Sequence, residues 1–211
     1  MIDYLIRGGP VMIPLLLSSV LALGVILERF WALRTPRVLP PAVTEALLRM
    51  EGSERVDTLL RTCQQYASPL SRMLAQGVMN RKRPREDCVQ ILYNVGRRET
   101  HDLERGLLML ELVAGIAPLL GLLGTVLGMV NIFDVITQMG MGQAQVLSKG
   151  ISQALITTIA GLFIGIPALA AYNFFAKRVD DLVIELERQI TVMLHKIYGS
   201  AAPDSLPQVT S

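Results

Sequence analysis

Five polar side chains lie inside two long apolar segments of the chain, where a hydrogen-bonding group is costly unless it has a partner. They are Thr125 and Asn131 in one segment, and Gln153, Thr157 and Thr158 in the other. Hydroxyl and amide groups donate and accept hydrogen bonds but do not ionise near neutral pH. They can line a polar path or bind a protonated acid. A group that carries a proton by titration must therefore come from elsewhere, and a carboxylate on a partner helix fits this need.

Small residues accompany two of these threonines at helical spacing. The intervals alternate between three and four residues in two stripes, which are Ala114, Pro118, Gly121, Thr125 and Gly128, and then Ala154, Thr158, Gly161, Gly165, Ala168 and Tyr172. Small residues let helices approach each other closely in lipid. The stripes therefore predict either plain packing seams or a polar interior that admits a partner helix.

The depth of the polar groups can be estimated from the nearest charged residues. Thr125 lies nine positions before the charged residue that follows its segment, and Thr158 lies nine positions after the one that precedes its own. At 1.5 Å per residue both lie ~13 Å from the same membrane boundary, and Asn131 and Gln153 both lie ~5–6 Å from it. The matched depths predict a polar layer that faces a shared interior.

The segments that carry these groups are long enough to cross a bilayer. Residues 8–27, 112–133 and 150–176 contain no Asp, Glu, Lys or Arg, and about 20 helical residues span the hydrocarbon core. The 211 residues are 51% hydrophobic, and the mean hydropathy is +0.44, which is far too apolar for an ordinary soluble domain. We predict an all-α membrane protein with three transmembrane helices. "ERFWALR" follows the first run in place of a small-residue cleavage site, which favours an uncleaved anchor over a signal peptide.

Lys and Arg are distributed unevenly between the segments. Fourteen lie in residues 28–106, four in residues 177–211, and one each in residues 1–9 and 134–149. Because cytoplasmic loops carry an excess of Lys and Arg, we expect the large loop and the C-terminus inside and the N-terminus outside. The predicted order is an N-terminus and first membrane helix over 1–31, a helical loop over 32–106, a second membrane helix over 107–137, an outer turn over 138–148, a third membrane helix over 149–176, an amphipathic helix over 177–199 and a disordered tail over 200–211.

The helical loop shows apolar residues at helical spacing, interrupted at Gly52, and "SPLSRMLAQGVMNRK" predicts a further helix. Pro84, followed by Glu86 and Asp87, is typical of a helix start. The chain contains no proline from there to Pro118, so we expect one continuous helix that runs into the second membrane segment. The third membrane helix is expected to continue through the amphipathic segment, and no strand pattern is present.

The sequence offers little for catalysis, metal binding or nucleic-acid binding. Cys63 and Cys88 fall in the inner loop, where thiols stay reduced, so both are expected to be free. His101 and His195 are far apart and show no metal-ligand spacing. No P-loop or nucleophile elbow is present, and the net charge of +2 is too small to suggest a nucleic-acid partner. We therefore predict no enzyme activity, no metal and no cofactor.

Four stretches resemble a known family. They are "GGPVMIPLL" before the first helix, "LERFWAL" after it, "LELVAGIAPLLGLLGTVLGM" in the second, and "GISQALITTIAGLFIGIPALAAYN" in the third. Together they resemble the MotA/TolQ/ExbB proton-channel family, and most closely its ExbB branch. They cover all three predicted membrane helices in order.

The resemblance implies a homopentamer in the bacterial inner membrane, with a periplasmic N-terminus and a cytoplasmic C-terminus. The central pore would hold an ExbD-like single-span partner, whose intramembrane aspartate takes and releases the proton, and a TonB-like protein would receive the mechanical work. The pore threonines of the family map onto Thr125 and Thr158. ExbB proteins often carry a glutamate where this chain has Gln153, so the charge of that side chain is absent here.

These considerations define the predicted site. The ion pathway comprises Thr125, Thr157, Thr158, Gln153 and Asn131, and the partner helix packs in the pore against Ala114, Pro118, Gly121, Gly128, Ala154, Gly161, Gly165 and Ala168. Two alternatives stay open. One is a TolQ-type or other stator subunit for envelope maintenance or motility, and the other is a non-conducting membrane scaffold in which both stripes only pack.

Overall fold

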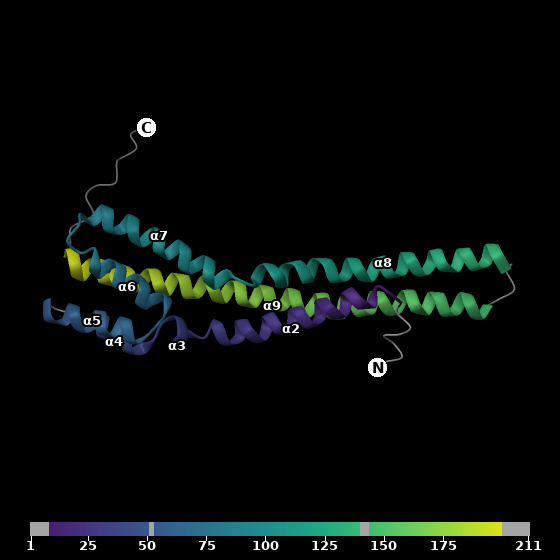
Figure 1. Cartoon of the computed structure of the whole chain (residues 1–211), viewed down its shortest axis with the longest axis horizontal. Coiled ribbons are helices and arrows are strands. Elements are labelled where there is room, and N and C mark those ends of the chain that lie inside the picture. The colour runs from purple at the N-terminus through teal and green to yellow at the C-terminus, as the bar shows by residue number, and fades with distance from the viewer. Residues whose placement is uncertain (1–8, 51–52, 140–143, 200–211) are drawn as a thin grey trace, which may run out of the picture. The chain divides into compact units, whose positions relative to one another are not determined.

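The computed structural model describes residues 9–50, 53–139 and 144–199, and all regular structure within them is α-helical. In chain order the helices are α2 (Met12–Ala32), α3 (Thr35–Val38), α4 (Pro41–Leu48), α5 (Ser53–Gln65), α6 (Pro69–Met79), α7 (Arg85–Glu104), α8 (Leu107–Met139) and α9 (Ala144–Tyr198) (Figure 1). The all-α prediction is confirmed for the described part of the chain. The tail over 200–211 lies outside the described residues.

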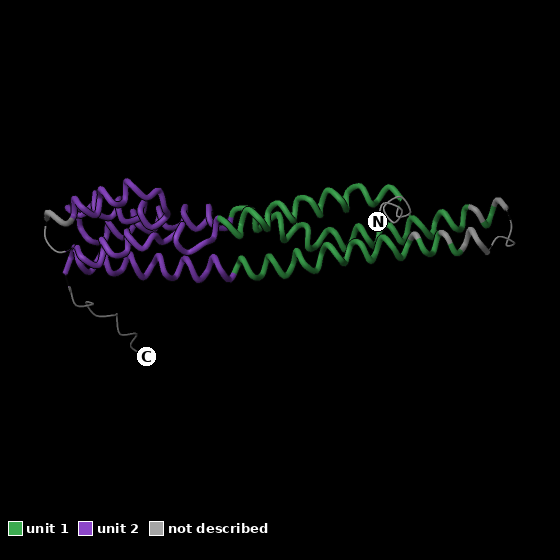
Figure 2. The backbone as a smooth tube through the Cα atoms, turned by 90° about the horizontal axis from the view of Figure 1, so that it is seen from below, with its two compact units in different colours: residues 1–31, 105–176 green, residues 32–104, 177–211 purple. Residues whose placement is uncertain are grey.

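The chain divides into two compact units (Figure 2). The first, which we call the membrane unit, comprises residues 1–31 and 105–176, and the second, which we call the loop unit, comprises residues 32–104 and 177–211. α9 contributes residues to both units. Among the described residues, three helices are long and apolar enough to cross a membrane, within Met12–Ala32, Leu107–Asp134 and Gly150–Tyr198. They agree with the three predicted membrane helices, and the chain is a membrane protein.

The expected continuous helix from Pro84 into the second membrane segment is wrong. α7 does begin directly after Pro84, with Glu86 and Asp87 in its first turn, but it ends at Glu104, and α8 starts at Leu107. Gly106, between them, has a φ of 87°, a left-handed conformation that favours glycine and commonly ends helices. Counting prolines misses this kind of break, because the glycine needs no proline to stop a helix.

The loop unit is held together by a leucine-rich core. Leu47, Leu59, Leu70 and Leu74 are completely buried, as is Met193 of α9. The start of α6 is set by Ser68, whose Oγ accepts a hydrogen bond from the Ser71 backbone N–H at 3.1 Å, and by proline in the first turn. The loop unit is therefore a packed helical domain in its own right.

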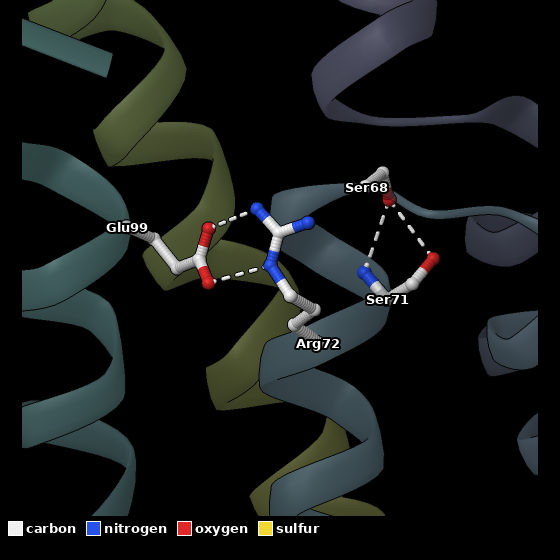
Figure 3. A network of polar contacts seen from close by, with 4 residues as sticks. All are labelled: Ser68, Ser71, Arg72 and Glu99. Atoms are coloured by element: carbon white, nitrogen blue, oxygen red, sulfur yellow. Dashed lines mark hydrogen bonds and ion pairs between the residues drawn. The ribbon is translucent and has the colours of Figure 1, made fainter. Parts of the chain in front are cut away.

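An ion pair joins α6 to α7 inside the loop unit (Figure 3). Arg72 Nε donates to Glu99 Oε1 at 2.7 Å, and Arg72 Nη2 donates to Glu99 Oε2. The Glu99 side chain is 7% exposed, whereas that of Arg72 is 50% exposed. The bidentate pair thus places a carboxylate inside the unit and satisfies it with a guanidinium that reaches in from the surface.

The C-terminal part of α9 is bonded to the loop helices at both ends. Arg178 Nη2 donates to Thr35 Oγ1 at 2.6 Å, and Lys196 Nζ donates to the backbone carbonyl of Leu48 at 2.7 Å. Leu48 is the last residue of α4, so Lys196 satisfies a carbonyl at a helix end. The prediction that the third membrane helix continues through the amphipathic segment is confirmed.

Both cysteines are free, as predicted, and both are buried in the loop unit. Burial raises the pKa of the Cys63 thiol to about 11, because an apolar environment disfavours the thiolate. The Cys63 thiol therefore ionises at a lower pH in the unfolded chain than in the folded one. The contribution of the neutral thiol to the free energy of unfolding is complete below the unfolded-state pKa and is lost as the pH rises through about 11.

Native protein at mildly alkaline pH is therefore expected to react with iodoacetamide at Cys63 and Cys88 at least about 100-fold more slowly than unfolded protein. Mass spectrometry of the alkylated peptides measures both rates, and protein in denaturant is the control. Equal rates in native and denatured protein would show that the two thiols are accessible and would contradict their burial.

Candidate ion pathway along α8 and α9

The backbones of α8 and α9 come into direct contact in the membrane unit, where Figure 1 shows the two helices side by side. A methyl carbon on Gly161 would lie 2.5 Å from the carbonyl oxygen of Ala117 and 3.0 Å from the Cα of Gly121. Such distances are below van der Waals contact, so only glycine fits at this crossing. The absence of a side chain allows the close approach of membrane helices.

The predicted small-residue stripes form this contact within one chain, and we call it the α8–α9 seam. A methyl carbon on Gly165 would lie 2.7 Å from the Pro118 ring, and one on Gly128 would lie 3.1 Å from the Ala154 side chain. All eight residues that were predicted to pack against a partner helix are buried or half-buried, namely Ala114, Pro118, Gly121, Gly128, Ala154, Gly161, Gly165 and Ala168. The seam accounts for their small size, and contact with a partner helix stays a prediction.

Thr157 lies in the middle of the seam. Its side chain is completely buried, and its hydroxyl donates to the Ala154 carbonyl at 2.8 Å. A methyl carbon on Gly124 would lie 2.4 Å from Thr157 Oγ1, so the threonine fills the space that this glycine leaves. The observed contacts of Thr157 are those of a packing residue, and its place in an ion pathway stays a prediction.

Thr125 and Thr158 are both half-buried. The Thr158 hydroxyl donates to the carbonyl of Gly121 at 3.3 Å, and the Thr125 hydroxyl donates to Leu122, in its own helix, at 2.6 Å. Thr125 follows Gly121 by four residues, so it lies on the same side of α8, about one turn further along the helix. The equal depth expected for the two threonines is therefore off by about one turn.

The structure does not place the Asn131 amide beside the two threonines. Asn131 is exposed, and it follows Thr125 by six residues, which places it ~120° away around α8. Gln153 belongs to α9, but its side chain lies outside the described residues. The prediction placed all the polar groups in one layer. The helical geometry of α8 instead turns Asn131 away from the side that carries Thr125.

Sequence reasoning missed two residues that shape the seam. Gly124 makes room for Thr157, and the carbonyl of Ala117 lies against Gly161. Neither residue belongs to the stripe predicted on α8. Gly124 lies one position before Thr125 in that stripe, and Ala117 lies one position before Pro118. The signal that could have identified them is the width of a helix face, because close packing uses neighbouring rows on either side of one stripe.

Residues 65–188 match the model of the MotA/TolQ/ExbB proton channel family. This match covers more than half of the chain, including α8 and the membrane part of α9. The chain belongs to the MotA/TolQ/ExbB family. The family is one of transport subunits, in agreement with the resemblance seen in the sequence.

Relatives from two branches of the MotA/TolQ/ExbB family are similar to this chain. An ExbB-like biopolymer transport protein of Synechocystis is 33% identical over 178 residues, which cover 82% of this chain and 69% of the relative. Biopolymer transport protein exbB1 of Vibrio cholerae is 29% identical over 84% of this chain and 79% of its own length. The Tol-Pal system protein TolQ of Haemophilus influenzae is 35% identical over 50% of this chain and 48% of its own length. The family is shown, and its ExbB and TolQ branches are both represented.

Proposed function

We propose that this chain is an ExbB-type proton-channel subunit of the bacterial inner membrane. With an ExbD-like partner it converts the proton motive force into mechanical work on a TonB-like protein, for transport across the outer membrane. The observation that supports this most is the pair of half-buried threonines on one side of the α8–α9 seam, in a chain of a proton channel family. Threonine does not titrate, so the partner's aspartate carries the proton, and the hydroxyls hydrogen-bond its acid form.

The partner helix is proposed to contact the open edge of the seam. α8 and α9 already bury the glycines, so we assign the contact to the half-buried residues Ala114, Pro118, Thr125 and Thr158, and call them the threonine edge. Thr157, Asn131 and Gln153 are further proposed members of the pathway. In the proposed assembly five copies surround the partner, with the N-terminus periplasmic and the C-terminus cytoplasmic, in keeping with the excess of Lys and Arg in residues 28–106.

Proton flux in a defined complex tests this proposal. The chain is co-purified with a co-expressed ExbD-like single-span protein and reconstituted into liposomes that contain a pH-sensitive dye. One proton that crosses 100 mV releases about 2.3 kcal/mol, so flux is measured under an imposed potential. We expect flux with the wild-type partner and none when its intramembrane aspartate is changed to asparagine. A stable complex without flux in either case favours the non-conducting scaffold, and flux that persists after the Asp→Asn change excludes a partner carboxylate.

The threonine edge is tested by the double variant Thr125→Ala/Thr158→Ala. We expect flux to fall about tenfold or more because the partner's acid loses two hydroxyl partners. Assembly is expected to persist, because the only interhelical hydrogen bond removed is the 3.3 Å contact from Thr158 to Gly121. Thr137→Ala is the matched control, since the Thr137 hydroxyl, like that of Thr125, donates within its own helix, to the Asp134 carbonyl at 2.8 Å. Normal flux in the double variant would show that the two threonines only pack.

A TolQ-type subunit is the second candidate, because TolQ proteins of Haemophilus influenzae and Pseudomonas aeruginosa are 35% and 36% identical to about half of this chain. Both candidates use the same proton pathway and differ in the protein that receives the work. Deletion of the gene distinguishes them. Loss of energised uptake supports the ExbB type, whereas loss of outer-envelope integrity with normal uptake supports the TolQ type.

A further inference from the structure

Two carboxylates belong to the second membrane-spanning helix, Glu111 near the start of its span and Asp134 at the end. Glu111 is the fifth residue of α8, within the span Leu107–Asp134. Four apolar residues, "LLML", precede it, and residues 112–133 after it carry no charge. At 1.5 Å per residue it lies ~6 Å beyond the start of the span. The span of 28 residues is ~42 Å long and exceeds the ~30 Å hydrocarbon core, so Glu111 lies near one edge of that core.

Glu111 is exposed on the surface of the chain. Within residues 9–50, 53–139 and 144–199 it forms no hydrogen bond and no ion pair. The helix dipole does not account for it, because that effect fades beyond the first turn and Glu111 lies in the second. Its environment must therefore come from outside this chain, as water, as lipid headgroups or as another protein.

Helical spacing places Glu111 in line with the threonine edge. It precedes Ala114 by three residues, Pro118 by seven and Thr125 by fourteen. Seven residues are nearly two full turns, and a straight helix drifts only ~20° per seven residues. Glu111, Pro118 and Thr125 therefore follow one side of α8, from one end of the span to its middle.

The other charged and titratable groups of the membrane unit do not take this place. Glu28 and Arg29, at the end of α2, bond to each other at 2.6 Å, and Arg105 lies before the span. On α9, residues 150–176 contain no charged residue, and Tyr172 is their one tyrosine. Asp134, the last residue of the same span, follows Thr125 by nine residues and so lies ~180° away around α8. Glu111 is thus the acid of this span that lies on the side of the threonines.

We propose that Glu111 is a proton-accepting residue of the pathway, at the end of α8 that lies nearest Leu107. The partner's carboxylic acid gives up its O–H proton, water passes it along the threonine edge, and a Glu111 carboxylate oxygen forms the new O–H bond. Glu111 then releases the proton to water on its side of the membrane. This role rests on the proposed function.

The test is proton flux through the reconstituted complex with Glu111→Gln, which keeps the size of the side chain and removes its proton-accepting carboxylate. We expect flux to fall about tenfold or more, with the yield and size of the complex unchanged. Glu111→Asp keeps a carboxylate and is expected to retain a substantial share of the flux. Glu104→Gln is the matched control, because Glu104 is an exposed carboxylate that lies before the span, and its flux is expected to be normal.

Each other outcome overturns the proposal. Normal flux with Glu111→Gln, in a complex whose wild type conducts, shows that Glu111 is not in the pathway, while the proposed function survives. Loss of the complex with Glu111→Gln shows that the carboxylate binds a basic group of another chain instead. A wild-type complex that does not conduct refutes the proposed function, and the role of Glu111 with it.

Carbodiimide labelling tests the same residue without the partner. Dicyclohexylcarbodiimide modifies carboxylic acids that are protonated in an apolar setting, and mass spectrometry identifies the modified peptide. In the full-length chain in liposomes we expect Glu111 to be modified at least about tenfold more than Glu104, because Glu111 belongs to the apolar span and Glu104 lies before it. Equal modification of both residues would overturn the proposal.

Discussion

Gly161→Ala is expected to destabilise the membrane unit by about 3 kcal/mol or more. The new methyl carbon would lie 2.5 Å from the Ala117 carbonyl oxygen and 3.0 Å from the Gly121 Cα. Both are backbone atoms, so relief requires that one helix move away from the other. That movement would also break the hydrogen bond from Thr158 to Gly121. Unfolding of the purified protein in mixed micelles by increasing amounts of a denaturing detergent measures the change.

Gly115→Ala is the matched control on α8. Nothing lies within 4 Å of the position that a methyl carbon on Gly115 would occupy. Alanine is also the better helix former, by about 1 kcal/mol in soluble helices, so this variant is expected to be as stable as the wild type or slightly more stable. Equal losses in Gly115→Ala and Gly161→Ala would show that the two substitutions act through general helix effects and not through the seam.

Arg72→Met is expected to destabilise the loop unit by about 2–4 kcal/mol, because it leaves the Glu99 carboxylate buried without its partner. The hydrogen bond to Glu99 is the main reason that the pKa of Arg72 is raised. The expected loss is below that of a wholly buried pair, since the Arg72 side chain is half exposed. Amide hydrogen exchange of α6 and α7 in the full-length protein measures the change, as faster exchange of both helices.

Two further variants separate the pair from its surroundings. Arg72→Met combined with Glu99→Leu removes both charges and is expected to recover most of the stability, because an apolar pair of similar size often replaces a buried ion pair without loss. Arg188→Ala breaks the exposed pair with Glu185 and is expected to change little. If Arg72→Met behaved like Arg188→Ala, Glu99 would have to find another partner, and the pair would not hold α6 to α7.

Some features of the fold follow from local chemistry and could be predicted. The bilayer sets a minimum length for an apolar helix, so charge-free runs were enough to place all three spans. Pro84 with Glu86 and Asp87 marked the start of α7 for a similarly local reason. The break at Gly106 was missed because the prediction relied on the absence of proline, whereas a glycine in the left-handed conformation, here with a φ of 87°, also ends a helix.

The candidate site shows where local reasoning stops. The alternation of three and four residues identified one face of α8 and one face of α9. The pattern does not show which helix each face packs against. The structure places the two faces against each other in one chain, buries Thr157 opposite Gly124, and leaves Thr125 and Thr158 half-buried at one edge. The estimate of equal depth was off by a turn because charged residues mark the ends of a span only loosely.

The sequence by itself determined three features of this protein. They are the number of membrane helices, the absence of a carboxylate from residues 112–133 and 150–176, and membership of the MotA/TolQ/ExbB family. Hydrophobicity and charge act on each segment separately, so they can be summed along the chain. The register of α8 against α9, and with it the hydroxyl that faces inward, was decided only by the tertiary structure. That register depends on contacts such as the hydrogen bond from Thr158 to Gly121, which joins residues 37 positions apart. No local pattern encodes where two helix backbones meet.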